Sequence, residues 1–308
     1  MKPDNMNPVK AMKIDKNMKA SELVSRMAEC GFQARKLAEA SEIFVEMIKD
    51  KDCVKFLGLA GALVPAGMKE IIIEMLEKGH VNVLVSTGAN LTHDLIEALG
   101  EKHYIGTEKI DDFELNKKGI DRIYNVFMEN KVYSVLEKFF EENWEEISKC
   151  KNIKELLWKL GELVDGEGIL GTCWKNKIPV FCPGIADSGI GLMIWGRKAA
   201  GKKIFIDAFE DMNEIIDLAW TAKRRGVVYL GGGVPKNFIQ QSLQFSKGAD
   251  FGIQITTALE QDGGSSGAPL REGISWGKLN EKAKFVNVFC DVTIALPLLY
   301  SFVKDKIN

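Results

Sequence analysis

Seven short runs of apolar, often β-branched residues recur along the chain, and they constrain its fold more than any other feature. Most are apolar at consecutive positions, which is typical of strands in a parallel sheet that has helices on both faces. Segments with a helical period lie between several of them. Strand and helix therefore alternate, which predicts an α/β fold with a doubly wound, mainly parallel Rossmann-like sheet. The expected strands are residues 54–59, 81–86, 178–182, 203–206, 226–230, 251–256 and 285–290.

The helical segments suggest one large domain with additions. We expect helices at residues 67–78, 91–99, 212–224 and 235–246, and one or two more within 20–47. A long charged stretch at about 116–161 interrupts the alternation and is expected to be a helical insertion. With no repeat and no Pro-rich or Gly/Ser-rich linker, residues 19–308 are predicted to form a single domain. Residues 1–18 are predicted to be a flexible N-terminal arm.

Charge and composition exclude several partners. The chain has 41 Lys and Arg against 43 Asp and Glu, a net charge of −2, so it presents no electrostatic case for binding nucleic acid or an anionic membrane surface. No run reaches the roughly 18 apolar residues of a membrane span. We therefore expect a cytoplasmic protein. Its six cysteines form no C-x-x-C pair and are expected to be buried free thiols.

Three common catalytic motifs fail on inspection. Residues 263–267 fit G-x-S-x-G, but an α/β hydrolase needs a histidine after the serine, and His80, His93 and His103 all precede it. No H-E-x-x-H pattern is present, so we expect no metal site. No G-x-x-x-x-G-K-[ST] occurs either, which excludes a P-loop.

A triple glycine remains as the main binding signal. Gly231, Gly232 and Gly233 follow the strand at 226–230 and precede a helix opened by Pro235. Backbone N–H groups and a helix N-terminus at this place suit a pyrophosphate or a close flat ligand. A tight turn without a ligand is an equally good interpretation of the glycines taken alone.

Small and acidic residues stand at several other expected strand ends. In an open α/β sheet these ends form the ligand crevice, so the set fits a nucleotide whose ribose hydroxyls bind carboxylates. Taken singly, Asp187 and Asp291 could instead cap helices. The set comprises Ser86, Thr87, Gly88, Ala89, Asp187, Ser188, Gly189, Thr256, Thr257, Ala258, Asp262, Gly263 and Asp291.

Lys278 is the strongest candidate for covalent chemistry. A lysine acts as a nucleophile only as the free amine, so it needs surroundings that disfavour its charge. Trp276, two residues away, could help to exclude water, and Glu272 lies just upstream. The alternative is an ordinary solvated lysine in a loop, which is far commoner for an arbitrary lysine.

At this point the chain resembles the deoxyhypusine synthase family, from about Gly31 to its C-terminus. The triple glycine, the Asp-Gly loop and the Trp-Gly-Lys element all coincide, in the same order and at compatible spacing. The matching segments are residues 31–34, 56–58, 83–87, 178–181, 230–234, 262–267 and 275–278.

The resemblance implies an NAD-dependent aminobutyl transfer from spermidine to a lysine of a translation initiation factor precursor, through an imine on an enzyme lysine. Lys278 matches that lysine, and Trp276 and Glu272 match the polyamine pocket. A homotetramer with sites at subunit interfaces is also implied. The implied NAD-binding residues are Thr87, Gly88, Ala89, Asp187, Gly231, Gly232, Gly233, Thr257, Ala258, Asp262 and Asp291.

On the cofactor side, Gly61 and Ala62 stand where the family has a Ser-Asn pair, and His93 stands where it has a glutamate. Three positions of the implied amine pocket also depart from the family pattern. Leu192 and Ser265 stand where the family has acidic residues that grip the polyamine, and Asn237 stands where it has a histidine. Losing two carboxylate contacts would cost roughly 3 to 6 kcal/mol of amine binding. An altered amine donor or acceptor, as in homospermidine synthesis, is therefore an alternative. A conventional NAD dehydrogenase and a non-catalytic binding protein on the same fold also stay open.

Overall fold

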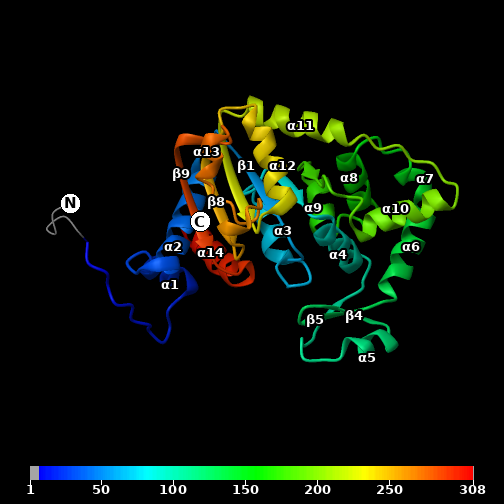
Figure 1. Ribbon diagram of the computed structural model, residues 1–308, viewed down its shortest axis with the longest axis horizontal. Helices are drawn as coiled ribbons and strands as arrows, with labels where there is room; N and C mark the ends of the chain where they lie inside the picture. Colours follow the sequence, from blue (N-terminus) through cyan, green and yellow to red (C-terminus); the bar gives the residue numbers. More distant parts are fainter. Residues whose placement is uncertain (1–6, 308) are drawn as a thin grey trace.

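The computed structural model describes residues 7–307, and a six-stranded sheet lies at its centre (Figure 1). The strand order is β6-β2-β1-β7-β8-β9, and every neighbouring pair is parallel. Counted along the chain, this is the 3-2-1-4-5-6 order of a doubly wound Rossmann sheet, so the predicted fold class is confirmed. The strands are β1 (Cys53–Leu59), β2 (Val83–Ser86), β6 (Val180–Phe181), β7 (Arg224–Leu230), β8 (Ala249–Thr256) and β9 (Leu279–Phe289).

Two hydrophobic cores lie on opposite faces of this sheet. Alternate residues of a strand point to opposite faces, so Val228 and Leu230 enter one core while Val227 and Tyr229 enter the other. The larger core is covered by α2 (Phe32–Lys49), α3 (Lys69–Glu77), α4 (Gly88–Ala98) and α14 (Val292–Ile307), with α1 (Ala20–Met27) packed on α2 and α14. The smaller core is covered by α11 (Ala208–Thr221) and α12 (Gly233–Gln244).

The insertion between α4 and β6 is only partly helical, which corrects the expectation for residues 116–161. It contains a small antiparallel sheet with the order β3-β5-β4, which projects from the body in Figure 1. Tyr124, with φ of 53°, turns the chain between β4 and β5. The elements are β3 (His103–Ile105), α5 (Asp112–Lys117), β4 (Ile120–Ile123), β5 (Val126–Glu129), α6 (Val132–Glu142), α7 (Trp144–Ile147), α8 (Ile153–Leu163) and α9 (Gly168–Lys175).

The strand expected at residues 203–206 is wrong. This segment links α10 (Gly189–Ala199) to α11 without pairing with any strand. Ile204 and Ile206 pack against the larger core, so their alternation reflects packing and not sheet formation. Of the expected N-terminal arm, residues 1–6 lie outside the described residues. Residues 7–18 form no helix or strand, and Asp15 pairs with Arg26 of α1 at 2.7 Å.

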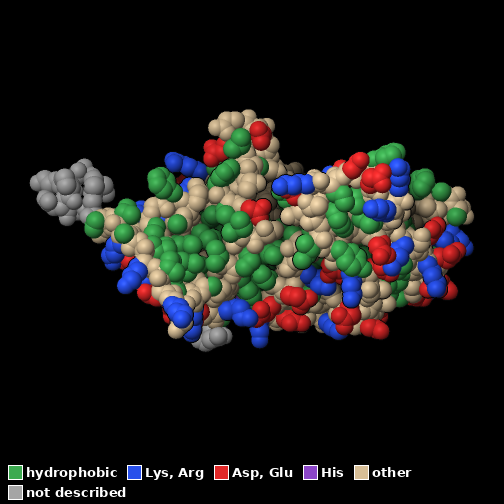
Figure 2. Space-filling model, turned by 90° about the horizontal axis from the view of Figure 1, so that it is seen from below, with side chains coloured by type: hydrophobic (Ala, Val, Ile, Leu, Met, Phe, Trp, Pro, Cys, Tyr) green, Lys and Arg blue, Asp and Glu red, His purple; other side chains and the backbone are tan. Residues whose placement is uncertain are grey.

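Side-chain chemistry is unevenly spread over the surface. Seen from below, apolar side chains gather in the half nearer the N-terminal end, while Lys and Arg alternate with Asp and Glu in the other half (Figure 2). All six cysteines are free thiols, four of them buried. Within residues 7–307, no helix has both the length and the apolar character needed to cross a membrane.

Candidate active site

The loops that follow four strands, β1, β2, β7 and β9, bond to a neighbouring strand at the carboxyl edge of the sheet. Each donates a backbone N–H to the end of that strand, so the sequence-predicted binding residues near these ends share one edge. The order places β1 beside β7, where the direction of winding reverses and ligands of such sheets bind. The bonds run from Thr87 N to Leu59 O (3.1 Å), Ala60 N to Leu230 O (3.0 Å), Gly231 N to Ile255 O (2.8 Å) and Cys290 N to Thr256 O (3.2 Å).

The triple glycine forms a turn that tolerates no larger residue. Gly231 and Gly233 have φ of 82° and 59°, a left-handed region that favours glycine. A Cβ added to Gly232 would lie 2.5 Å from Ser266 Cα. Gly232 is the N-cap of α12 and has no side-chain cap, so N–H groups of its first turn face the edge. An uncapped helix N-terminus that follows a glycine turn suits an anionic group such as a pyrophosphate.

The loops after β2 and β6 pack on each other at the start of α4. A Cβ on Gly88 would lie 2.4 Å from Ser188 Cβ, so the residue after Asp187 packs directly on the start of α4. Thr87 caps α4, and its hydroxyl donates to Gly61 O at 2.8 Å. Ser188, and not Asp187, caps α10, which leaves the exposed Asp187 carboxylate available to a ligand.

The loops after β8 and β9 supply the remaining predicted cofactor residues. Asp262 ends a short 3-10 helix (Glu260–Asp262), and Thr257 and Asp262 are both exposed. Asp291 accepts from Thr293 N at 2.8 Å, so it caps α14 as well as facing solvent. A hollow of about 300 Å³ lies beside these loops, lined in part by Ala258.

Lys236 is a buried cation that the sequence analysis missed. It lies three residues after the triple glycine, and its side chain is 1% exposed. Its Nζ donates to Gln254 Oε1 (3.0 Å) and to the carbonyls of Ser265 (2.8 Å) and Ala268 (2.5 Å). Burial lowers its pKa from 10.5 to about 8, with Glu272 opposing the change and Lys278 adding to it. Lys236 thus holds the 265–268 loop against α12.

Glu272, Trp276 and Lys278 come together on and after α13 (Glu272–Ser275). The ammonium of Lys278 lies 4.8 Å from the centroid of the Trp276 ring. Trp276 is itself 57% exposed, so one chain alone gives Lys278 an incomplete apolar cover. Asn237 lies in the first turns of α12, and the Ser265 hydroxyl donates to Gly233 O at 3.4 Å.

The structure separates Lys278 from the cofactor edge of the same chain. Ala249 N, at the first residue of β8, donates to Lys278 O at 3.1 Å. Thr257 follows the last residue of this eight-residue strand. Seven steps of about 3.3 Å put the two ends of the strand roughly 23 Å apart, so the backbone of Lys278 and Thr257 lie at opposite ends of β8.

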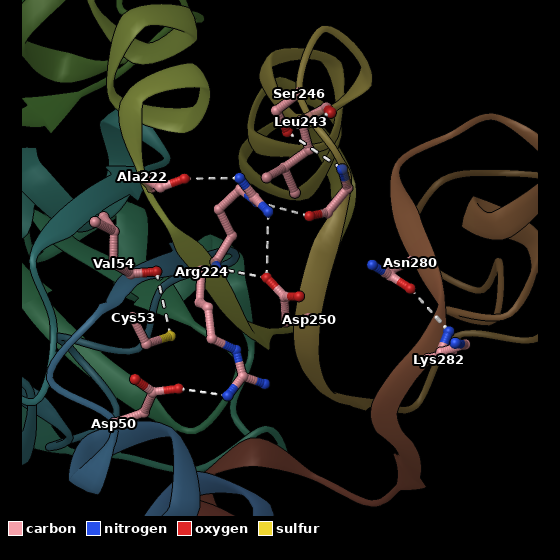
Figure 3. Close-up of polar contacts among 12 residues, drawn as sticks. Asp50, Cys53, Val54, Ala222, Arg224, Leu243, Ser246, Asp250, Asn280 and Lys282 are labelled. Atoms are coloured by element: carbon pink, nitrogen blue, oxygen red, sulfur yellow. Dashed lines mark hydrogen bonds and ion pairs between the residues drawn. The ribbon is translucent and has the colours of Figure 1, made fainter.

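Polar contacts of Arg224 and Arg225 cross the amino edge of the sheet, where the backbone of Lys278 lies. Arg224 of β7 binds Asp50 at 2.6 Å, and Asp250 of β8 lies beside them in Figure 3. The buried Arg225 donates to Gly248 O at 2.7 Å, next to the start of β8. These contacts tie the start of β8, which bonds the backbone of Lys278, to β7 and to Asp50.

Leu192 is also remote from Lys278 within one chain. It lies on α10, which packs on α4 near the β6 side of the sheet, whereas Lys278 precedes β9 at the other side. Leu192 is 53% exposed, and its neighbour Trp195 is 67% exposed. The predicted amine-binding residues thus form two groups on separate faces of one chain.

Together, the sheet order and the glycine-lined edge define an open α/β protein with a ligand crevice outside its strand ends. Comparison with known proteins is consistent with this class of protein and identifies one family within it. The deoxyhypusine synthase family model matches residues 22–303. The chain belongs to the deoxyhypusine synthase family, whose members are transferases.

Several archaeal relatives match almost end to end. "Probable deoxyhypusine synthase 1" of Methanosarcina acetivorans is 43% identical, with 99% of this chain and 97% of the relative covered. The protein of the same name from Archaeoglobus fulgidus is 41% identical, with 97% and 98% covered. A crystal structure from Entamoeba histolytica whose description names the same enzyme has a TM-score of 0.64 at 20% identity, covering 96% of each chain, and supports the fold.

Proposed function

We propose that the protein is an NAD-dependent aminobutyl transferase that moves the butylamine part of spermidine to a lysine of a translation initiation factor precursor. The observation that carries this proposal is a glycine cradle for a dinucleotide in a chain that also presents Lys278 beside an indole. The cradle fits the cofactor because the uncapped N-terminus of α12 follows the glycine turn and carboxylates at the same edge of the sheet are exposed. When bound, NAD accepts a hydride from the carbon beside the amine and later returns it.

The chain's own residues would divide the remaining work. Gly231, Gly232 and Gly233 would bind the pyrophosphate, and Asp187, Asp262 and Asp291 would accept from ribose hydroxyls. Lys278 would attack the oxidised carbon, form an imine with release of 1,3-diaminopropane, and pass the butylamine to the acceptor lysine. Trp276 would exclude water from that imine, and Glu272 would bind an ammonium group.

We propose that a second copy of the chain completes this site. The backbone of Lys278 lies at the opposite end of β8 from Thr257, roughly 23 Å along the strand, and the Lys278 of one copy would face the glycine cradle of another. The exposed Leu192, Trp195 and Trp276 and the apolar area in Figure 2 supply surface for such an interface. A homotetramer with shared sites follows from this proposal.

Borohydride trapping tests the chemistry directly. Incubation with NAD and spermidine followed by borohydride should attach the butylamine to a peptide that contains Lys278. Lys278→Ala and Lys278→Arg should trap nothing, while the matched control Lys282→Ala, at an exposed lysine of β9, should trap normally. Trapping that persists in Lys278→Ala would contradict the assigned nucleophile.

Mixing two inactive variants tests the shared site. Lys278→Ala lacks the nucleophile, and Asp187→Ala lacks a cofactor contact, so each alone should be inactive. If one copy supplies each half, co-refolded mixtures should recover part of the wild-type turnover. A mixture that stays inactive, although analytical ultracentrifugation shows mixed oligomers, would place both halves in one chain.

A retuned amine specificity is the second candidate function. Around Lys236, the one carboxylate of Glu272 is balanced against two cations, Lys236 and Lys278. Leu192, Asn237 and Ser265 add no charge to the amine-binding residues. A donor or acceptor with fewer ammonium groups, as in homospermidine synthesis, suits this balance.

A panel of amines separates the two candidates. Under the retuned specificity, Leu192→Asp combined with Ser265→Asp should raise kcat/KM for spermidine by roughly two decades, as expected for two added carboxylate contacts. Full wild-type activity with spermidine and the factor's lysine would refute retuning. Steady accumulation of NADH would instead indicate a dehydrogenase.

A further inference from the structure

Three polar side chains from α12, β8 and β9 form one hydrogen-bonded network beside the glycine cradle. Its centre is Gln254 of β8, which is fully buried. Gln254 Oε1 accepts from Lys236 Nζ and from Asn287 Nδ2, both at 3.0 Å. Gln254 Nε2 donates to Ser266 O at 2.9 Å and to Gly231 O at 3.4 Å. Gln254 therefore uses both lone pairs and both N–H groups of its amide.

The neighbours of Gln254 fix the direction in which its amide faces. An ammonium group only donates, so the atom of Gln254 that faces Lys236 is the oxygen. Asn287 Oδ1 accepts from Leu270 N at 3.1 Å, which leaves its NH₂ group to face the same oxygen. The other end of the Gln254 amide faces two carbonyls and is the NH₂ group. A flipped amide would set oxygen against oxygen, so the network has one arrangement.

The network attaches one loop, residues 265–270, to the body of the protein. These residues belong to no helix or strand, so neither a helix nor a sheet fixes their place. The bonds from Lys236, Gln254 and Asn287 tie the loop to α12, β8 and β9. All of them go to backbone atoms of the loop, which belong to Ser265, Ser266, Ala268 and Leu270.

The same loop packs directly on the glycine cradle. A Cβ on Gly232 would lie 2.5 Å from Ser266 Cα, and the Ser265 hydroxyl donates to Gly233 O at 3.4 Å. Gln254 bonds on both sides of this contact, to the loop and to the first carbonyl of the glycine run. The position of the loop thus sets how close Ser265, a candidate amine-binding residue, lies to the candidate pyrophosphate site.

We propose that Gln254, with Lys236 and Asn287, is a positioning residue that holds the 265–270 loop against the cradle, so that the bound amine and the bound cofactor meet at the reacting distance. The inference rests on the proposed function, because it takes NAD and an amine as the ligands. It goes further by assigning a role to side chains that contact neither ligand. A misplacement of about 1 Å between reacting groups costs about a hundredfold in rate, so the effect should appear in kcat.

Gln254→Met in the full-length protein tests this, because methionine is similar in shape and makes none of these hydrogen bonds. With NAD and spermidine, kcat should fall about a hundredfold, while the Kd for NAD and the KM for spermidine stay within about threefold of wild type. Without any ligand, the amide proton of Leu270 should exchange with solvent about tenfold faster than in wild type. The control Gln244→Met, at an exposed glutamine of α12, should change none of these quantities.

A double variant separates positioning from simple stability. Gln254→Met leaves the buried Lys236 ammonium short of an acceptor, whereas Lys236→Met combined with Gln254→Met removes both partners and should recover part of the free energy of unfolding. Its kcat should nevertheless stay about a hundredfold below wild type, because the loop is still released. Recovery of kcat together with stability, or wild-type kcat and exchange in Gln254→Met, would overturn this inference alone. Wild-type protein that binds no NAD would overturn the proposed function and this inference with it.

Discussion

Because of Lys236, the free energy of unfolding should rise with pH in the alkaline range. The pKa of this lysine falls from 10.5 to about 8 on folding. Between these values the unfolded chain still holds a proton that the folded chain has released, so the free energy of unfolding rises with pH. At about 1.4 kcal/mol per pH unit, the full rise is about 3 kcal/mol, and about 2 kcal/mol of it is present by pH 9.5.

Denaturant unfolding of wild type and Lys236→Met at several pH values isolates this contribution. Subtracting the two curves removes the titration of all other groups, and the difference should grow in favour of wild type by about 2 kcal/mol from pH 7 to 9.5. Lys282→Met, which removes an exposed lysine, is the matched control and should give a flat difference. A flat or falling difference for Lys236→Met would refute the reasoning.

Two further substitutions test the geometry of the site and its support. Gly232→Ala should weaken NAD binding at least tenfold, measured by calorimetry, because the added Cβ would lie 2.5 Å from Ser266 Cα. In the control Gly264→Ala, the added Cβ meets nothing within 4 Å, so this variant should bind NAD normally. Equal NAD affinities of the two variants would count against the cradle. Asp94→Asn should lower the free energy of unfolding by about 1–3 kcal/mol, because the new amide N–H faces one of the two backbone N–H groups that Asp94 now accepts at the start of α9. Burial raises the pKa of Asp94 from 3.8 to about 6, so its contribution to the free energy of unfolding should increase as the pH falls through 6 towards 3.8. If wild type and Asp94→Asn showed the same pH dependence of the free energy of unfolding, this reasoning would be wrong.

Several parts of the candidate site could be predicted from the sequence because they depend on local pattern. A glycine run after a buried strand, as at Gly231, leads to a strand-end turn wherever the strand lies in a parallel sheet. Thr87 caps the helix that follows β2 for the same local reason. Asp187 was open to a capping interpretation, and Ser188 takes that role instead.

Other parts depend on contacts between residues far apart in the chain. In the sequence, Lys236 looks like an ordinary exposed lysine of a helix. Only the packing of the 265–268 loop against it makes it a buried cation. Hydrogen bonds that run from Lys69 through Glu97 and His103 to His93 join α3, α4 and β3, although these side chains share no sequence motif. The small sheet of β3, β4 and β5 was missed because its strands are three or four residues long, too short for a clear period.

The sequence by itself determined the alternation of strand and helix, and hence that all strand-end loops meet at one edge, because parallel strands point the same way. Only the tertiary structure decided where Lys278 lies. The connection from β8 to β9 returns to the amino edge before the last strand begins, so the backbone of Lys278 lies at the amino edge of the sheet, whereas the glycine cradle lies at its carboxyl edge. Periodicity reports which face of an element is buried, but it carries no information about the path of a long connection through space.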